Sequence, residues 1–209
     1  MTSLYQDLLD RSPDPGGLAY YVNLIDTGLL TRSQAAAQFF TSPEFTNGGL
    51  YVIKLYSSIL KRDPDFGGWK YWFDVTHSGL PATTVLNSFL TSPEFQQLYG
   101  TVSDADFINL VYQNVLGRQP DAGGYAYWFG YLNAGSLSRA TVMDSFVRSP
   151  EYDNTVRASG YANLLYMGFL RRSADKAGLA YWKGVLGNFS NLPIAIGDFI
   201  QSPEYLSRF

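Results

Sequence analysis

The sequence contains no cysteine and only one histidine among 209 residues. The absence of cysteine excludes disulfide frameworks, thiolate metal sites and cysteine nucleophiles. The single histidine, His77, argues against a metal centre, and no Ser-His-Asp pattern surrounds it. We expect His77 to lie at the exposed end of a helix.

Charged residues are also scarce, at 16%, and the formal net charge is −3. With 15 lysines and arginines, an acidic chain offers little to a phosphate backbone, so we expect no nucleic-acid partner. No apolar run approaches the ~20 residues that span a bilayer, so we expect no membrane insertion. Residues 1–4 lack the basic and apolar regions of a signal peptide, and the first periodic segment begins at once. We therefore expect the chain to be a fragment of a longer protein.

Aromatic residues, in contrast, are abundant: the chain has 16 tyrosines, 14 phenylalanines and four tryptophans. Disordered chains are poor in aromatic residues and rich in charge, so this composition predicts a folded protein. A globule of this length buries roughly 70% of its unfolded surface and forms one or two domains.

Four segments repeat one pattern. Each carries Leu or Val before a tyrosine, an arginine six residues later, an aspartate before a pair of small residues, an aromatic doublet, and a closing Ser-Pro-Glu-aromatic motif. The separation between the tyrosine and the glutamate differs by at most one residue among the segments. We predict four repeats, over residues 1–50, 51–102, 103–158 and 159–209.

The pattern inside each repeat is helical. Apolar residues recur at i, i+3 and i+4, as in Tyr56, Ile59 and Leu60, and strand signals are nearly absent. The loop aspartate can cap a second helix, and Ser-Pro-Glu supplies an N-cap, a proline at the first helical position and an acidic first turn. We predict an all-α tandem array with about four short helices in each repeat.

The repeated charged residues are interpreted as structural, because an enzyme rarely carries four copies of its site in one chain. We predict that each arginine pairs with an acidic residue of its own or the next repeat; breaking such a pair would cost about 3–5 kcal/mol if it were buried. The residues concerned are Arg11, Arg62, Arg118 and Arg172; Asp14, Asp65, Asp121 and Asp175; and Glu44, Glu94, Glu151 and Glu204.

The loops that carry the aspartates leave calcium as a minor alternative to capping, because one aspartate per loop is few against the several oxygen ligands of an EF-hand. We otherwise expect no cofactor. The glycine pairs lack the spacing of a phosphate-binding loop and are expected to allow a tight turn with close approach of two helix backbones. Ala177 replaces the first glycine of the last pair, so we expect only the second glycine to need its special backbone.

The aromatic doublets are the candidate binding residues. Consecutive helical residues point about 100° apart, so one member is expected to pack inside and the other to lie in a groove. Core packing accounts for most of the aromatic residues, and a ligand platform is the alternative. Trp69 is the preferred specificity residue, because the other repeats have Leu18, Tyr125 and Leu179 there. The candidate ligand-binding residues are Tyr20, Trp69, Tyr71, Trp72, Tyr127, Trp128, Tyr181 and Trp182.

Together these motifs resemble the bacterial domain-of-unknown-function family 4214 over essentially the whole chain. Members of that family occur in tandem, often in large secreted or cell-surface proteins, and some lie beside calcium-binding nonapeptide repeats, which this chain lacks. The family is also distantly similar to phycobilisome linker domains. The resemblance implies an extracellular or cell-surface location and a modular role, and it transfers no catalytic residue.

We therefore expect a non-enzymatic, exported or cell-surface module for protein interaction, adhesion or structural scaffolding. Its expected partners are proteins or an extracellular polysaccharide, and self-assembly is a further option. A carbohydrate-binding module with Tyr and Trp platforms is the alternative. A hydrolase would instead need one cleft that joins non-repeated acids such as Asp63, Asp104 and Asp106.

Overall fold

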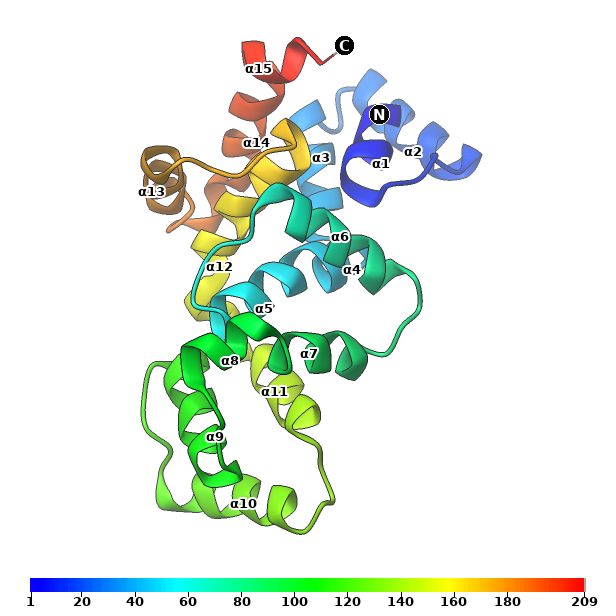
Figure 1. The fold of residues 1–209 in the computed structure, drawn as a ribbon. Coiled ribbons are helices and arrows are strands. Elements are labelled where there is room, and N and C mark those ends of the chain that lie inside the picture. Colours follow the sequence, from blue (N-terminus) through cyan, green and yellow to red (C-terminus); the bar gives the residue numbers. More distant parts are fainter. Residues whose placement is uncertain (209) are drawn as a thin grey trace. The chain divides into compact units, whose positions relative to one another are not determined.

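A computed structural model describes residues 1–208, and this part of the chain consists of helices and loops without a strand (Figure 1). The predicted all-α class is confirmed. In chain order the elements are α1 (Thr2–Leu9), α2 (Pro15–Asp26), α3 (Arg32–Thr41), α4 (Pro43–Phe45), η1 (Thr46–Leu50), α5 (Tyr51–Ile59), α6 (Phe66–His77), α7 (Ala82–Leu90), α8 (Pro93–Tyr99), α9 (Asp104–Val111), η2 (Tyr112–Leu116), α10 (Ala122–Asn133), α11 (Arg139–Val147), α12 (Pro150–Leu165), η3 (Tyr166–Leu170), α13 (Lys176–Val185), η4 (Phe189–Asn191), α14 (Leu192–Gln201) and α15 (Pro203–Leu206). The elements η1, η2 and η3 are π-helices and η4 is a 3₁₀-helix.

The helices recur in one order along the four predicted repeats. A first helix carries the repeated tyrosine, a second follows the loop aspartate, a third carries a repeated phenylalanine, and a short helix begins at Ser-Pro-Glu. The first helices are α1, α5, α9 with η2, and the end of α12 with η3; the second are α2, α6, α10 and α13; the third are α3, α7, α11 and α14; the short ones are α4, α8, the first turns of α12, and α15. The number of repeats itself remains a prediction.

Side-chain caps explain where many of these helices begin. Each second helix starts after an aspartate that accepts the N–H of the glycine three residues on, at 2.7–2.9 Å. Each short helix starts after a serine that accepts the N–H of the motif's aromatic residue, at 3.1–3.3 Å. Thr31 forms a capping box with Gln34 at the start of α3, and Ser103 caps α9. Local sequence therefore determines these boundaries.

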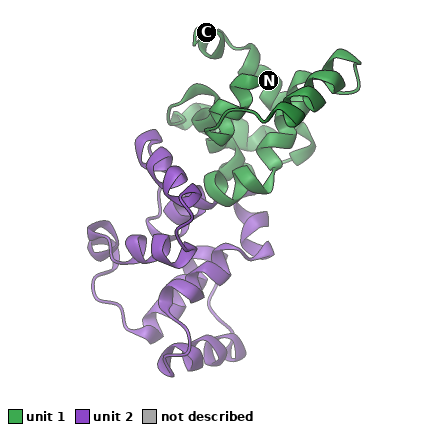
Figure 2. Ribbon diagram, turned by 90° about the vertical axis from the view of Figure 1, so that its right-hand side faces the viewer, with its two compact units in different colours: residues 1–50, 158–209 green, residues 51–157 purple. Residues whose placement is uncertain are grey.

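The described chain divides into two compact units (Figure 2). Unit 1 contains residues 1–50 and 158–209, and unit 2 contains residues 51–157. Unit 1 thus combines the first and last predicted repeats, and unit 2 combines the two middle ones. Helix α12 contributes to unit 2 up to Arg157 and to unit 1 from Ala158.

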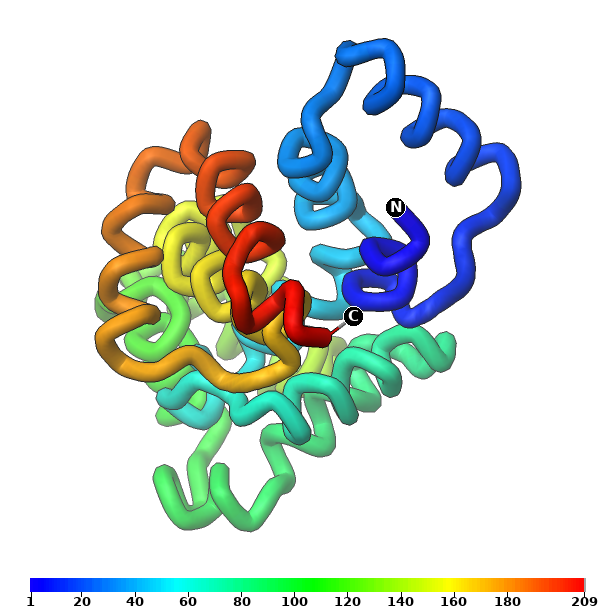
Figure 3. The backbone as a smooth tube through the Cα atoms, turned by 90° about the horizontal axis from the view of Figure 1, so that it is seen from above, coloured from blue at the N-terminus to red at the C-terminus, as the bar shows by residue number. Residues whose placement is uncertain are grey.

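In unit 1 the core is shared by segments from the two ends of the chain. Helix α14 packs on α3 and η3 packs on α1, an arrangement visible in Figure 3 where the red C-terminal helix lies beside the pale-blue α3. Phe40 and Phe169 stack at 5.0 Å between ring centroids and are fully buried. The side chain of Asp7 in α1 is 3% exposed and accepts hydrogen bonds from Arg171 at 2.9 Å and Arg208 at 2.7 Å.

Unit 2 repeats this plan, with α11 packed on α7 and the fully buried Leu55, Leu86 and Met143 between the helices. Lys54 of α5 is also buried there, where its ammonium ion-pairs with Asp153 and donates to the Val147 carbonyl at 3.1 Å. A buried cation is tolerated because both groups compensate for its lost hydration.

Candidate functional site

Each predicted repeat contains a continuous series of ring contacts that runs from an arginine to the surface. In unit 2 the Arg62 guanidinium lies 4.9 Å from the Tyr56 ring centroid, and Tyr56 meets Phe89 edge to face at 5.2 Å. Phe89 contacts Trp72 at 4.9 Å, and Trp72 meets Tyr71 edge to face at 5.0 Å. The same contacts join Arg11, Tyr5, Phe39, Tyr21 and Tyr20; Arg118, Tyr112, Phe146, Trp128 and Tyr127; and Arg172, Tyr166, Phe199, Trp182 and Tyr181.

The two members of each doublet differ in exposure, because they lie about 100° apart around the second helix. The second members, Tyr21, Trp72, Trp128 and Trp182, are half-buried. The first members are exposed: Tyr127 by 55%, Tyr20 by 59%, Tyr71 by 61% and Tyr181 by 62%. Each exposed tyrosine rests edge to face on a ring that is itself anchored on the core. The structure thus presents a supported surface tyrosine in every predicted repeat.

Trp69 does not belong to this surface, so its selection as the specificity residue is wrong. Its side chain is 2% exposed and stacks on Phe73 at 5.0 Å between centroids. Positions 69, 72 and 73 lie on one face of α6, and that face packs inward.

The repeated arginines pair with the glutamates of their own repeats. Arg62 Nε and Nη2 donate to the two Glu94 oxygens at 2.6 and 3.0 Å, and Arg172 pairs with Glu204 in the same way at 2.5 and 2.9 Å. These side chains are 38–47% exposed, so they are not the buried pairs considered above, and an exposed ion pair contributes little stability. The hydrogen bonds from Arg62 and Arg172 lower the pKa values of Glu94 and Glu204. The corresponding pairs are Arg11–Glu44 and Arg118–Glu151.

The loop aspartates use one oxygen each for capping, and the Gly124 and Gly178 N–H groups lower the pKa values of Asp121 and Asp175. The arginine of the same repeat lies near the second oxygen, at 4.0 Å for both Arg11–Asp14 and Arg62–Asp65.

The second glycine of each pair is required for a different reason than predicted. Gly17, Gly68, Gly124 and Gly178 lie in the first turn of a helix, and none of them has a positive φ. A Cβ atom at Gly68 would stand 2.5 Å from the Tyr56 hydroxyl, whereas one at Gly67 would meet only the Asp65 side chain, at 3.3 Å. The glycine therefore makes room for a tyrosine hydroxyl, and not for a second helix backbone. Burial raises the pKa of the Tyr56 hydroxyl.

The described residues, 1–208, contain no cluster of metal ligands. No set of three or more His, Asp or Glu side chains in that part of the chain could hold a metal ion. His77 is the exposed last residue of α6, with Nδ1 2.8 Å from the Phe73 carbonyl. Asp104 pairs with Arg139, and Asp106 accepts from Ser103. Over the same residues, no helix has the length and apolar character to cross a membrane.

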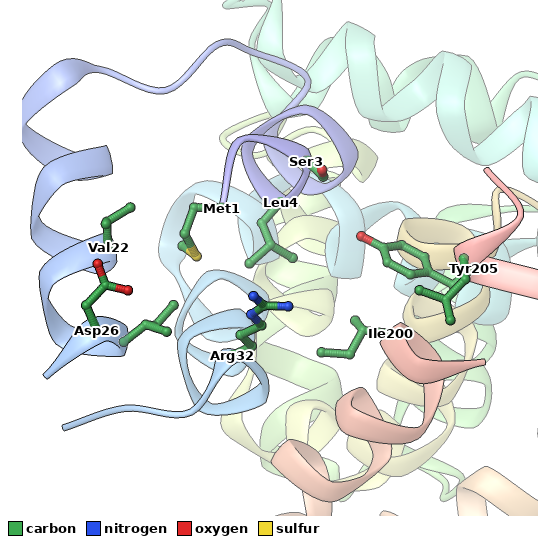
Figure 4. Close-up of a pocket in the computed structure, with 10 residues that line it drawn as sticks. Met1, Ser3, Leu4, Val22, Asp26, Arg32, Ile200 and Tyr205 are labelled. Atoms are coloured by element: carbon green, nitrogen blue, oxygen red, sulfur yellow. The ribbon is translucent and has the colours of Figure 1, made fainter. Parts of the chain in front are cut away.

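Sequence reasoning missed a groove of about 430 Å³ in unit 1 (Figure 4). Helix α2 forms one wall, α14 and α15 form the other, and the start of α1 and Arg32 of α3 lie between them. The lining residues are Met1, Ser3, Leu4, Val22, Ile25, Asp26, Arg32, Ile200, Tyr205 and Leu206. No motif marks this groove, because its walls come from opposite ends of the chain. Burial, together with the nearby Asp7, raises the pKa of Tyr205 to about 12.

A family model described as "Domain of unknown function (DUF4214)" matches residues 1–49, 86–156 and 152–209. The three segments fit tandem repetition, and most of the second predicted repeat lies outside them. No curated protein matches the chain. The similarity to phycobilisome linker domains stays a prediction.

Proposed function

Because the chain belongs to the DUF4214 family, whose description carries no activity, we propose a role from the surface of the molecule. The chain is a non-catalytic interaction module of an exported or cell-surface protein. A protein partner contacts the exposed tyrosines of the second helices, Tyr20, Tyr71, Tyr127 and Tyr181.

The supported surface tyrosine is the observation that carries this proposal. Tyrosine is enriched at protein interfaces because it joins a large apolar ring to a polar tip. Fixing a side chain at an interface costs conformational entropy. The edge-to-face contact between Tyr71 and Trp72 already restricts the tyrosine, so less of that entropy remains to be lost on binding. The same support recurs in each predicted repeat, which favours a partner that binds several repeats at once.

Site-specific photo-cross-linking tests the proposal. A benzophenone amino acid replaces Tyr71 or Tyr127 in the full chain, and a matched variant carries it at Leu98, which is 47% exposed but outside the doublets. Irradiation of the cells that produce the protein should give discrete cross-linked protein species from positions 71 and 127 and none from position 98. Equal cross-linking at all three positions, or none at any, would count against the tyrosine surface.

The alternative partner is an extracellular polysaccharide, favoured by one feature of α10. Tyr127 and Tyr131 are both exposed there, with ring centroids 4.9 Å apart, so two adjacent rings are open to a ligand. Aromatic faces suit the apolar faces of sugar rings. Co-sedimentation with insoluble polysaccharides, lost in the Tyr127→Ser/Tyr131→Ser variant and retained in Leu98→Ser, would select this alternative.

The proposal of export rests on the resemblance to a family whose members often occur in large secreted or cell-surface proteins. Protease treatment of intact producing cells tests this part independently. A surface-exposed protein should be degraded, and an intracellular one should survive until the cells are lysed.

A further inference from the structure

Unit 2 contains a pocket of about 440 Å³ that the proposed function does not use. It is formed by the end of α5 and the loop after it, by η2 with Gly117, and by the first turns of α12, so all its lining residues belong to unit 2. Lys61 and Arg62 bring two cations to the pocket, and Asp63 brings a carboxylate. Its volume lies within the range of small-ligand sites, about 300–1,000 Å³.

Lys61 is the lining cation that lacks a carboxylate partner. Arg62 is paired with Glu94, whereas the only hydrogen bond of the Lys61 ammonium within residues 1–208 goes to the Asn114 carbonyl, at 3.2 Å. Burial lowers the pKa of Lys61, because no opposite charge compensates for the lost hydration. Both other lysines of unit 2 have an aspartate partner. An ammonium has three donors, so two donors of Lys61 remain for a ligand.

Unit 1 has a carboxylate at the equivalent place. Five residues after the repeated tyrosine, unit 2 has Lys61 and unit 1 has Arg171, and both have a left-handed backbone, with φ of 56° and 51°. Two residues after the tyrosine of the other repeat in each unit, unit 2 has Asn114 and unit 1 has Asp7. Arg171 Nη2 donates to Asp7 Oδ1 at 2.9 Å, and the Asp7 side chain is 3% exposed. The cation of unit 1 is therefore neutralised within the chain.

In unit 2 the cation is kept and the carboxylate is replaced by an amide. Asn114 is neutral, and its Nδ2 donates to the Tyr99 hydroxyl at 2.9 Å. The left-handed backbone of Lys61 is unfavourable for a residue with a Cβ atom, and Gly117 shows that glycine fits the same position in the next predicted repeat, with φ 68°. Strained residues of this kind cluster at ligand sites. The feature that distinguishes the Lys61 position is therefore its uncompensated positive charge.

We propose that this pocket, the Lys61 pocket, binds a carboxylate group of a ligand. The carboxylate accepts from the remaining donors of the Lys61 ammonium, as Asp7 accepts from Arg171 in unit 1. The group belongs to a free small acid or to an acidic side chain of a partner protein, and both present the same chemistry to the pocket. Charge complementarity and the ion pair at the equivalent place select a carboxylate. The inference goes beyond the proposed function, because it does not use the exposed tyrosines.

Amide NMR shifts of the full chain, titrated with glutarate at low ionic strength, test the proposal, because salt screens exposed charges. We expect saturating shifts around Lys61 and Asn114 and none with glutaramide, which has the same carbon skeleton without the charge. Lys61→Met should weaken binding at least about tenfold, since a hydrogen bond to a charged group carries about that much affinity. Lys183→Met removes an exposed lysine of unit 1 outside the pocket and should leave binding unchanged.

A second variant, Asn114→Asp, supplies the unit 1 carboxylate from within the chain. It should pair with Lys61 and weaken the binding of glutarate as strongly as Lys61→Met does, although the lysine is still present. A hexaglutamate peptide distinguishes the two sources of the carboxylate. Tighter binding of the peptide than of glutarate assigns the pocket to an acidic segment of a partner, and tighter binding of glutarate assigns it to a free acid.

Circular dichroism checks that both variants are folded. The proposal is overturned if neither glutarate nor hexaglutamate gives saturating shifts up to about 10 mM, or if the Lys61→Met chain binds as well as the unaltered one. Shifts that glutaramide, or sodium chloride of equal ionic strength, reproduces would show that the pocket does not recognise a carboxylate and would also overturn it.

Discussion

Gly67 and Gly68 of α6 test whether the second glycine is required to make room for the Tyr56 hydroxyl. They are neighbours in one helix turn, and replacement by alanine should affect the stability of the protein in opposite directions at the two positions. Replacement of Gly68 by Ala places a Cβ atom 2.5 Å from the Tyr56 hydroxyl, a separation that forces a shift. Replacement of Gly67 by Ala meets only the Asp65 side chain, at 3.3 Å.

The magnitudes follow from two opposing effects. Alanine in place of glycine stabilises a helix by up to about 1 kcal/mol. At Gly68 this gain is offset by movement of the Tyr56 ring, which is 5% exposed and held between Phe89 and Arg62. Such overpacking costs about 1–3 kcal/mol. We expect Gly67→Ala to be neutral or stabilising and Gly68→Ala to be destabilising, with about 2 kcal/mol between them.

Urea unfolding of the full chain, followed by tryptophan fluorescence, measures the difference. Three of the four tryptophans, Trp69, Trp72 and Trp128, lie in unit 2 and report on it. The Tyr56→Phe variant removes the hydroxyl, so the cost of Gly68→Ala should largely disappear in that background, as a double-mutant cycle reveals. Equal midpoints for the two alanine variants, or an undiminished cost in the Tyr56→Phe background, would refute the steric explanation.

Two ion pairs should respond differently to mutation. Arg62→Ala should lower the free energy of unfolding by only about 1 kcal/mol, because its pair with Glu94 is exposed; a loss of 3 kcal/mol in urea unfolding would contradict this. Arg62 lowers the pKa of Glu94 in the folded state, so the ion pair stabilises the fold at pH values above the ordinary glutamate pKa. This stabilisation is lost as the pH falls through the lowered pKa. The difference in urea midpoint between the unaltered chain and Glu94→Gln should therefore shrink below about pH 4. Asp153→Ala should lower the free energy of unfolding by about 2–3 kcal/mol, because it leaves the buried Lys54 ammonium without its carboxylate partner. Lys54→Met should lower it less, because it removes the buried charge itself. The reverse order of thermal midpoints would show that burial of the ammonium is not the dominant cost.

Repetition in the sequence was enough to predict the helical class and many helix boundaries. The loop aspartates and the Ser-Pro-Glu serines act within three residues of themselves, so their hydrogen bonds need no knowledge of the rest of the fold. The split of each aromatic doublet into a half-buried and an exposed ring is also local, because it follows from helix geometry.

Trp69 and the glycines show where such reasoning fails. Trp69 has no equivalent in the other repeats, and this suggested a role in specificity. The difference between repeats, however, says nothing about the direction of a side chain. The α6 surface that carries Trp69 faces inward, and this direction depends on the helices packed against it. The second glycine of each pair was expected to need a special backbone, and its real constraint is a tyrosine hydroxyl from another helix.

The sequence by itself determined the repeated motif, the helix starts and the division of each aromatic doublet between two directions around its helix, because each depends on residues a few positions apart. Only the tertiary structure decided that residues 1–50 share a core with residues 158–209, and that Arg32 lies in a groove between α2 and α14. Those outcomes depend on contacts between distant segments, and the four predicted repeats carry no local signal that tells one partner from another.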